Sequence, residues 1–222
     1  MSTIRELFDD WAREGRAEGM EAGHGPAARL AFQRLGLQRA GRYLDIGCGN
    51  GYTVRWAAAA APDGHAMGVD ISDEMIGRAR RMSEGIPNVS FIAGAFPHVD
   101  AGAAPFDAVF SMEVLYYLPD LPAALRRIHD IMVPGGRFAC VVDYYGENEA
   151  SHGWPADLGV PMTLLDERGW SKAFEDAGLT VVEQSRLRLS PDAASSPWKV
   201  THGSLMTLGA RPGHGGSAEQ GR

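Results

Sequence analysis

Seven short apolar runs, most of them separated by longer amphipathic segments, follow one another from Arg42 to Ala210 and restrict the folds open to the chain more than any other feature. The first runs, RYLDI and HAMGVD, have the length and apolar content of buried strands, and the segments behind them repeat apolar residues at helical spacing. Strand followed by helix, several times over, is typical of a parallel sheet covered on both faces. We therefore expect an α/β fold with a doubly wound, mostly parallel, seven-stranded sheet.

The first residues of the chain depart from this alternation. The apolar side chains of IRELFDDW recur at spacings of three and four, which predicts one face of a helix. A second helix is expected after Pro26, because proline is favoured in the first turn of a helix. Between the two lies GRAEGMEAGHGP, which we interpret as a connector broken by glycines.

The end of the chain departs from the alternation as well. The last two apolar runs, residues 180–189 and 199–210, have no long helix between them, so we expect an antiparallel strand at the sheet edge. Residues 211–222 are rich in glycine and poor in apolar side chains, which predicts a disordered tail. Residues 1–210 are expected to form one domain, because a 222-residue chain with 45% hydrophobic residues fits a single core.

Charge and cysteine content argue against several classes of protein. A formal net charge of -7 disfavours binding through phosphate groups, so we expect no nucleic-acid partner. The apolar stretch WAAAAA is too short to span a bilayer, and no basic-then-apolar signal opens the chain, which predicts a cytoplasmic protein without a membrane partner. Cys48 and Cys140 lie far apart without CxxC spacing, so neither a disulfide framework nor a metal site is expected.

Three glycines at every second position, Gly47, Gly49 and Gly51, directly follow the first predicted strand. In a parallel sheet this turn contacts ligands, and glycine lets backbone N–H groups at a helix N-terminus come close to them. The alternative is that the glycines only form a tight turn. Asp70 ends the second predicted strand, roughly 20 residues further on, where a carboxylate accepts hydrogen bonds from ribose hydroxyls. Tyr52 stands where a dinucleotide-binding loop has its third glycine, so the pattern favours another nucleoside.

Four motifs in order carry a resemblance to a known family: YLDIGCGNGY, GVDIS, FDAVFSMEVLYYL and RRIHDIMVPGGRF. Together they resemble the class I S-adenosylmethionine-dependent methyltransferases, in particular the small-molecule, methyltransferase type 11-like members. The resemblance implies a Rossmann-like core over residues 39–210, an N-terminal helical lid over 1–38 and an acceptor-site insertion at about 144–165. It also implies S-adenosyl-L-methionine as cofactor and a small molecule as methyl acceptor, with an O-, N- or C-nucleophile left open.

The resemblance implies which residues line the cofactor. Side chains and backbone of the first turn would hold its methionine end, one carboxylate its ribose, and one apolar side chain its adenine. In that order the residues are Asp45, Gly47, Cys48 and Gly49, then Asp70, then Ile71.

The third and fourth strands add further candidates. Family members read Gly-Asp-Ala at the end of the third strand, but here Ala95 stands at the acidic position, so backbone groups and Phe96 would hold the adenine. The alternative is that Phe96 is simply a core residue. After the fourth strand, Ser111, Met112 and Glu113 are expected near the amino group and the methyl group of the cofactor. Glu113 pairing with an arginine is an equally open interpretation.

Methyl transfer does not require a general base, but phenols and amines benefit from one. Four residues are candidate catalytic groups: Glu21 and His24 in the N-terminal connector, and Tyr144 and His152 beyond the fifth strand. Aromatic side chains at the strand ends predict an acceptor pocket walled by rings, with core packing as the alternative. These are Tyr116, Tyr117, Tyr144, Tyr145 and Trp154.

Two other functions stay open from the sequence. A nicotinamide-dependent oxidoreductase is disfavoured by Tyr52, whereas a non-catalytic module that binds the nucleoside is favoured by Ala95. Methylation of a base or of glutamine is disfavoured, because the Asn/Asp-Pro-Pro-Tyr motif of those family branches is absent. The N-terminal helices and the segment after Tyr145 are also candidates for a homodimer interface.

Overall fold

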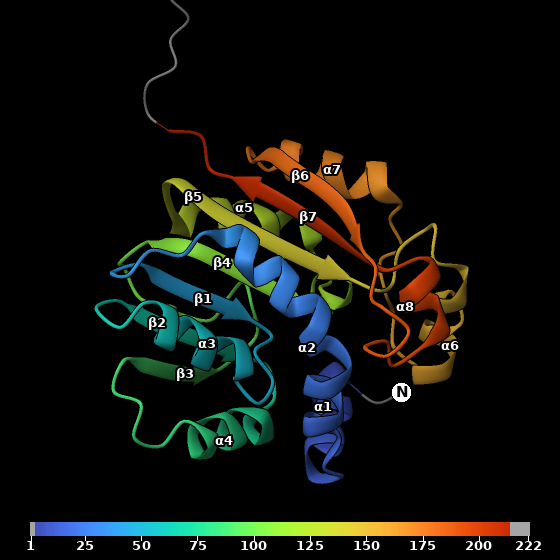
Figure 1. Ribbon diagram of the computed structural model, residues 1–222, viewed down its shortest axis with the longest axis horizontal. Helices are drawn as coiled ribbons and strands as arrows, with labels where there is room; N and C mark the ends of the chain where they lie inside the picture. The colour runs from blue at the N-terminus through green and yellow to red at the C-terminus, as the bar shows by residue number, and fades with distance from the viewer. Residues whose placement is uncertain (1–2, 214–222) are drawn as a thin grey trace, which may run out of the picture.

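The computed structural model describes residues 3–213, and in these residues seven strands form one sheet in the order β3-β2-β1-β4-β5-β7-β6 (Figure 1). Neighbouring strands from β3 to β5 are parallel, while β7 pairs antiparallel with both β5 and β6. The predicted α/β fold with antiparallel edge strands is therefore confirmed. The strands are β1 (Arg42–Ile46), β2 (His65–Asp70), β3 (Val89–Ala93), β4 (Phe106–Met112), β5 (Met132–Val142), β6 (Thr180–Leu187) and β7 (Ser204–Ala210).

The strand order reverses next to β1, which has β2 on one side and β4 on the other. Along β4 every residue except Asp107 is buried, as expected for a central strand with helices on both faces. Ligands of such sheets bind beyond the carboxyl ends of the strands at this reversal. The turns after β1, β2 and β4 are therefore the first place to look for a site.

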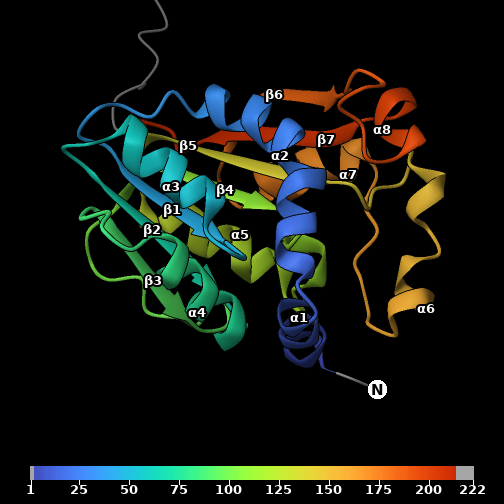
Figure 2. The same cartoon turned by 60° about the horizontal axis from the view of Figure 1, so that its bottom comes forward.

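Helices cover both faces of the sheet (Figure 2). One face packs against α2, α3 and α4, and the other against α5 and α7. The longer helices are α1 (Ile4–Arg13), α2 (Arg16–Leu35), α3 (Tyr52–Ala60), α4 (Asp73–Met82), α5 (Leu121–Ile131) and α7 (Glu167–Asp176). Short helical turns are η1 (Leu115–Tyr117), η2 (Glu149–Ser151), α6 (Trp154–Leu158) and α8 (Pro197–Thr201).

The helix α1 begins as its sequence predicts, with Thr3 and Glu6 in a capping box. The expected connector over residues 15–26 is wrong, because those residues are helical and Pro26 lies inside α2 instead of near its start. Proline removes one helical hydrogen bond and crowds the preceding turn, which leaves carbonyls there without donors. The carbonyl that loses its donor to Pro26 is that of Ala22, and the ammonium of Lys199 donates to the next carbonyl along the chain, that of Gly23, at 2.9 Å.

Two further expectations concern the end of the chain. The last predicted strand is shorter than the run that indicated it, because its first residues, Lys199 to Thr201, belong to α8. Most of the expected tail, from residue 214 onward, lies outside the described residues. Within residues 3–213, no helix is both long and apolar enough to cross a membrane.

Stability of the α7 face depends on Phe174, which is fully buried and stacks on Phe138 at 5.1 Å between ring centroids. We expect Phe174→Ala to lower the free energy of unfolding by about 3 to 5 kcal/mol, since it removes a large side chain that the core cannot refill. Urea unfolding measures this change. Val182→Ala is the control, because Val182 is 53% exposed and should change stability by no more than about 0.5 kcal/mol. A Phe174→Ala loss as small as the control's would contradict the packing described here.

Candidate functional site

The glycine turn after β1 serves packing and ligand access at different positions. Gly47, Gly49 and Gly51 all have positive φ, at 76°, 52° and 78°. A Cβ at Gly47 would collide with Val114, and one at Gly51 would lie 2.7 Å from the ring of Phe91. At Gly49 a Cβ would meet no protein atom within 4 Å, because this residue faces open space. Two of the glycines are thus required by neighbouring side chains, and the middle one leaves room for a ligand.

Asp70, at the end of β2, holds this turn and still offers acceptors to a ligand. One oxygen accepts from the backbone N–H of Gly49 at 2.9 Å, and the other from that of Ser72 at 2.9 Å. Each carboxylate oxygen has a further lone pair, so both remain able to accept from a vicinal diol. Burial raises the pKa of Asp70, while these N–H bonds counteract the shift by favouring the carboxylate.

Asp45 lies one position before the end of β1 and is 3% exposed. Its carboxylate accepts a hydrogen bond from the hydroxyl of Thr53 in the first turn of α3. Burial raises the pKa of Asp45 to about 7, with the Asp70 charge adding to the effect and the Thr53 bond opposing it. This carboxyl group is therefore poised to ionise when a cation comes close.

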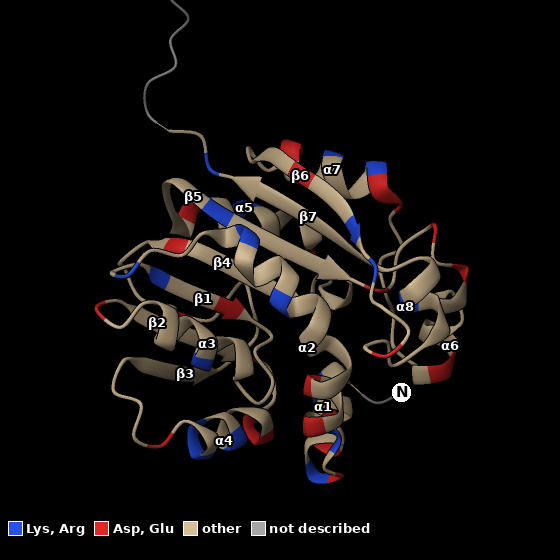
Figure 3. Cartoon of the chain, in the orientation of Figure 1, with Lys and Arg blue, Asp and Glu red and all other residues tan. Residues whose placement is uncertain are grey.

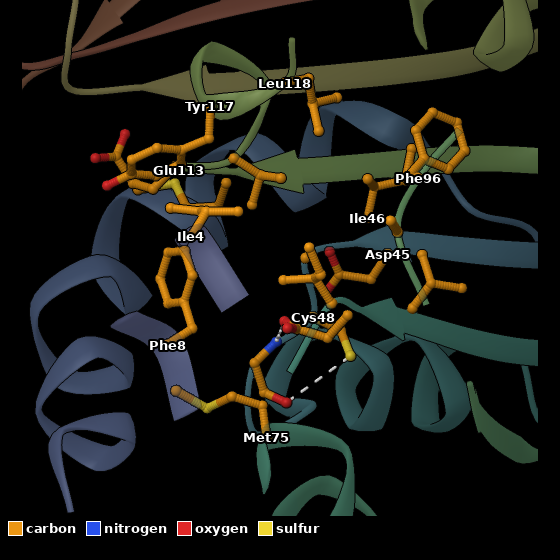
Figure 4. Close-up of a pocket in the computed structure, with 18 of the residues that line it drawn as sticks. Ile4, Phe8, Asp45, Ile46, Cys48, Met75, Phe96, Glu113, Tyr117 and Leu118 are labelled. Atoms are coloured by element: carbon orange, nitrogen blue, oxygen red, sulfur yellow. Dashed lines mark hydrogen bonds between the residues drawn. The ribbon is translucent and has the colours of Figure 1, made fainter. Parts of the chain in front are cut away.

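A cavity of about 540 Å³ opens above these residues, at the carboxyl ends of β1, β2 and β4 (Figure 4). Ile4 and Phe8 of α1 lie on one side of it and Phe96 on the other. The structure brings most of the predicted site residues to its wall. These are Glu21, His24, Asp45, Gly47, Cys48, Gly49, Asp70, Ile71, Ala95, Phe96, Met112 and Glu113.

Three predicted site residues lie away from this cavity. The Ser111 hydroxyl points into the sheet and donates to the carbonyl of Ile46 at 3.0 Å, because alternate residues of a strand face opposite sides. Tyr144 is 4% exposed, and its ring lies edge-on to Tyr116 in the core. The His152 side chain is exposed and contacts the carbonyl of Gly146 at 3.0 Å. None of the three is in position to contact a ligand there.

Glu21, on α2, is tied to the glycine turn. Its carboxylate accepts from the side-chain amide of Asn50 at 2.7 Å and lies 3.7 Å from the guanidinium of Arg55. Arg55 also donates to the backbone carbonyl of Asn50 at 2.7 Å. These contacts join Glu21 to Asn50 and Arg55, so this residue connects α2 to the glycine turn and α3.

Glu113, directly after β4, has φ of 61° and is the one non-glycine residue with positive φ among the described residues. Such a backbone costs about 1 to 3 kcal/mol and persists only where surrounding contacts hold it. The carboxylate accepts from the backbone N–H of Asp143 and, at 2.9 Å, from the hydroxyl of Tyr116. Burial and the nearby Asp143 charge raise the pKa of Glu113 well above its usual range. The predicted pairing with an arginine is not seen among the described residues.

His24, Glu113 and Asp143 bring their nitrogen or oxygen atoms within 4.8 Å of one another. Burial lowers the pKa of His24 to about 4, so the imidazole is neutral near pH 7. The ammonium of Lys199 lies 3.2 Å from Asp143, and both side chains are almost fully buried. A fixed ammonium in this cluster repels a metal ion, so a neutral imidazole beside an ion pair describes these residues better than a metal site.

A second cavity, of about 700 Å³, adjoins the first between α2, η1, α6 and α8. Some of its aromatic wall is predicted by the sequence, but Asp143 and Lys199 are not, because they lie 56 positions apart and meet only in the fold. Five residues border both cavities, so the two meet along their side chains. These are Phe8, Met20, His24, Glu113 and Tyr117.

Comparisons with known proteins agree with this geometry. A sequence model described as a methyltransferase domain matches residues 21–184. Sterol 24-C-methyltransferase of Aspergillus fumigatus is 29% identical over 181 residues, covering 76% of this chain and 47% of the relative. The chain thus spans about half the length of that curated relative.

Two solved structures extend the comparison. A chain from the complex between the Haloferax volcanii Trm112 methyltransferase activator and a methyltransferase matches with a TM-score of 0.86 and 32% identity, covering 95% of this chain and all of that one. An S-adenosylmethionine-dependent methyltransferase from Mesorhizobium loti has the same fold, with a TM-score of 0.67 and 19% identity over 82% of this chain and 96% of its own.

The raised pKa of Asp45 makes stability depend on pH. The unfolded chain ionises this carboxyl near pH 4 and the folded protein only near pH 7, so folding stability falls as pH rises between these values. We expect the unfolding free energy of the ligand-free wild type, relative to Asp45→Asn, to fall by about 2 to 4 kcal/mol from pH 5 to pH 8. Denaturant titrations of both proteins at the two pH values measure it. An unchanged or rising difference would show that Asp45 is ionised in the free protein.

Proposed function

The chain belongs to the class I S-adenosylmethionine-dependent methyltransferases, and from this premise we propose that it methylates a small molecule bound in the second cavity. The observation that carries the proposal is the junction of two cavities at Glu113, His24 and Tyr117. The first cavity has the chemistry that the cofactor needs, and the second has room for an acceptor.

The first cavity fits S-adenosylmethionine in three respects. The open space at Gly49 lets the chain approach the methionine end closely, and the free lone pairs of Asp70 suit ribose hydroxyls. Ile71, Ala95 and Phe96 line the cavity and offer apolar contacts for adenine. The carboxyl of Asp45 suits the cationic amino group. We therefore propose that apolar packing holds the adenine in place of the Asp that family members have at the position of Ala95.

S-adenosylmethionine supplies a methyl group bonded to a positively charged sulfur, and this sulfur becomes a neutral thioether when the methyl group is transferred. What the chain contributes is alignment and exclusion of water, and proximity alone accounts for roughly 7 to 11 kcal/mol of such a barrier. Phe8 and Met20 of the N-terminal helices border the junction with apolar side chains, and Ile4 lines the first cavity beside them. His24 and Glu113 border it with groups able to take a proton.

The N-terminal helices are proposed to act as a lid. Ion pairs join α1 to α4, where charged side chains gather (Figure 3), among them Arg5–Asp73 at 3.0 Å and Arg13–Glu74 at 3.5 Å. Exposed pairs of this kind contribute at most about 1 kcal/mol each. Asp9 also accepts a hydrogen bond from Ser72, and Ala12 packs with Met75 in a small buried cluster, so α1 must break these contacts as well when the proposed lid opens for ligands.

We also propose a protein partner of the Trm112 activator type, because a 32% identical chain was solved in complex with such an activator. The test is co-expression with Haloferax volcanii Trm112, followed by size-exclusion chromatography and a methyl-release assay. Co-elution with a higher rate of methyl release would support the partner. Separate elution, with an unchanged rate, would reject it and leave the methyltransferase proposal standing.

The decisive variant for the cofactor site is Gly49→Val. Its side chain would occupy the space that no protein atom fills, so we expect loss of S-adenosylmethionine binding by at least 100-fold in calorimetry with the fold retained. Gly85→Val is the matched control, since Gly85 also has positive φ, at 81°, with nothing within 4 Å, but lies outside the cavity. It should carry a similar backbone strain and bind the cofactor normally.

Two results would contradict the proposal. Full cofactor affinity in Gly49→Val would place the cofactor elsewhere. A wild type that binds S-adenosylmethionine tightly but releases no S-adenosylhomocysteine with any small-molecule acceptor would favour the non-catalytic binding module instead.

A further inference from the structure

The second cavity meets the cofactor cavity at carboxyl, imidazole and phenol groups, and its wall is aromatic. Rings of Trp11, Tyr116, Trp154 and Trp198 line it, and Trp154 lies 6.2 Å from Trp198 between ring centroids, at an interplanar angle of 64°. Aromatic faces attract both apolar groups and cations. We therefore expect a ligand with an apolar body. The charged groups of the wall determine which polar or charged group that ligand has.

The two cations of this wall are already neutralised. The Lys199 ammonium is paired with Asp143 and donates to the carbonyl of Gly23. Arg16 lies 2.7 Å from Glu14 and 5.7 Å from the ring centroid of Trp11, with an exposed side chain. Among the described residues, the wall thus offers no buried cation that is free to hold a carboxylate or a phosphate.

The acidic groups are not neutralised to the same extent. Glu113 and Asp143 face a single ammonium, that of Lys199, so the cluster carries one carboxyl group without a cationic partner. Asp143 is 1% exposed, and its Oδ1 atom is buried with no hydrogen-bond partner in the described structure. A buried, unpartnered acceptor at a cavity wall is unfavourable unless a ligand supplies a donor.

We propose that the second cavity binds an amine with an aromatic or similarly apolar body, and that Glu113 takes the proton of its ammonium group before methyl transfer. The inference rests on the proposed function and names the substrate class of that site. Glu113 suits the role because each oxygen accepts one bond from Asp143 or Tyr116 and keeps a second lone pair. The raised pKa of its carboxyl brings proton affinity closer to that of an amine.

A bound ammonium favours the ionised form of Glu113, against the burial and the Asp143 charge that raise the pKa of this carboxyl. The ammonium nitrogen then loses one proton to the Glu113 carboxylate and gains a free lone pair. That lone pair forms the new N–C bond to the methyl group as the C–S bond breaks, and the bonding electrons stay on sulfur. The product is a methylated ammonium and a neutral thioether, and the Glu113 proton passes to water when the site opens.

The test uses three probes that differ only at one end: 2-phenylethylamine, 2-phenylethanol and 3-phenylpropanoate. Binding of each to the full chain loaded with S-adenosylhomocysteine is measured by calorimetry or ligand-observed NMR. We expect the amine to bind at least 10-fold more tightly than the alcohol, and the carboxylate least tightly. With S-adenosylmethionine, mass spectrometry should then detect N-methylated amine.

Three variants distinguish the effect of the Glu113 charge on ligand binding from that of the aromatic wall. Glu113→Gln keeps the acceptor for Asp143, so the fold should remain while the 10-fold preference for the amine is lost. Trp198→Leu, which touches only the second cavity, should weaken the amine and the alcohol alike. Glu149→Gln, at an exposed glutamate outside both cavities, should keep the preference.

Separate readouts keep the two proposals apart. Loss of S-adenosylhomocysteine binding in the wild type would reject the proposed function itself. If the cofactor binds, then an alcohol or carboxylate bound as tightly as the amine, an amine preference that survives Glu113→Gln, or no binding of any probe would overturn the inference.

Discussion

Close contact between the turn after β1 and the turn after β4 is the constraint on which the site depends. It requires a residue without Cβ at Gly47, because Val114 already fills the space. The backbone N–H groups of Gly47 and Cys48 both donate to the carbonyl of Val69, at 2.8 and 3.0 Å, and Glu113 N–H donates to that of Val141 at 2.9 Å. The ends of four neighbouring strands are thereby joined. Such a rigid base lets the open position at Gly49 and the carboxylate of Asp70 keep their relative geometry without a ligand.

The N-terminal helices are joined to this base by polar contacts of unequal strength. Glu21 with Asn50 and Arg55 links α2 to the glycine turn, and Lys199 links α2 to α8. The second contact is a hydrogen bond from a buried ammonium to a backbone carbonyl, and the same ammonium forms its ion pair with Asp143, beyond the end of β5. The ion pairs of α1 with α4 are exposed, but Ala12 also packs with Met75 in a small buried cluster and Asp9 accepts a hydrogen bond from Ser72. Exposed and buried contacts together therefore hold α1, as they hold α2, which carries His24.

The sequence was sufficient for the features that depend on local pattern. The order of apolar runs predicts the strands, and the glycine spacing with Asp70 predicts which residues line the first cavity, since each of them lies at the end of its own strand. It was insufficient where distant segments meet. The pairing of Asp143 with Lys199 has no local signal, and neither has the hydrogen bond from Lys199 to the carbonyl of Gly23 in α2. The apolar pattern of β4 also could not predict which of two successive residues lines the cavity. Met112 does, whereas the hydroxyl of Ser111 donates to the neighbouring strand β1.

Glu113 has φ of 61°, a backbone conformation that glycine adopts without strain. Left-handed backbone costs a residue with Cβ about 1 to 2 kcal/mol, so the chain is less stable with glutamate here than the backbone alone would favour. The conformation aims the carboxylate across the end of β5 instead of along β4, toward the junction of the two cavities. Thermal stability and the direction of one side chain are in competition at this position. Glycine here would relieve the backbone but leave the N–H of Asp143 and the hydroxyl of Tyr116 without their acceptor, so the gain in backbone stability would be offset by two lost hydrogen bonds.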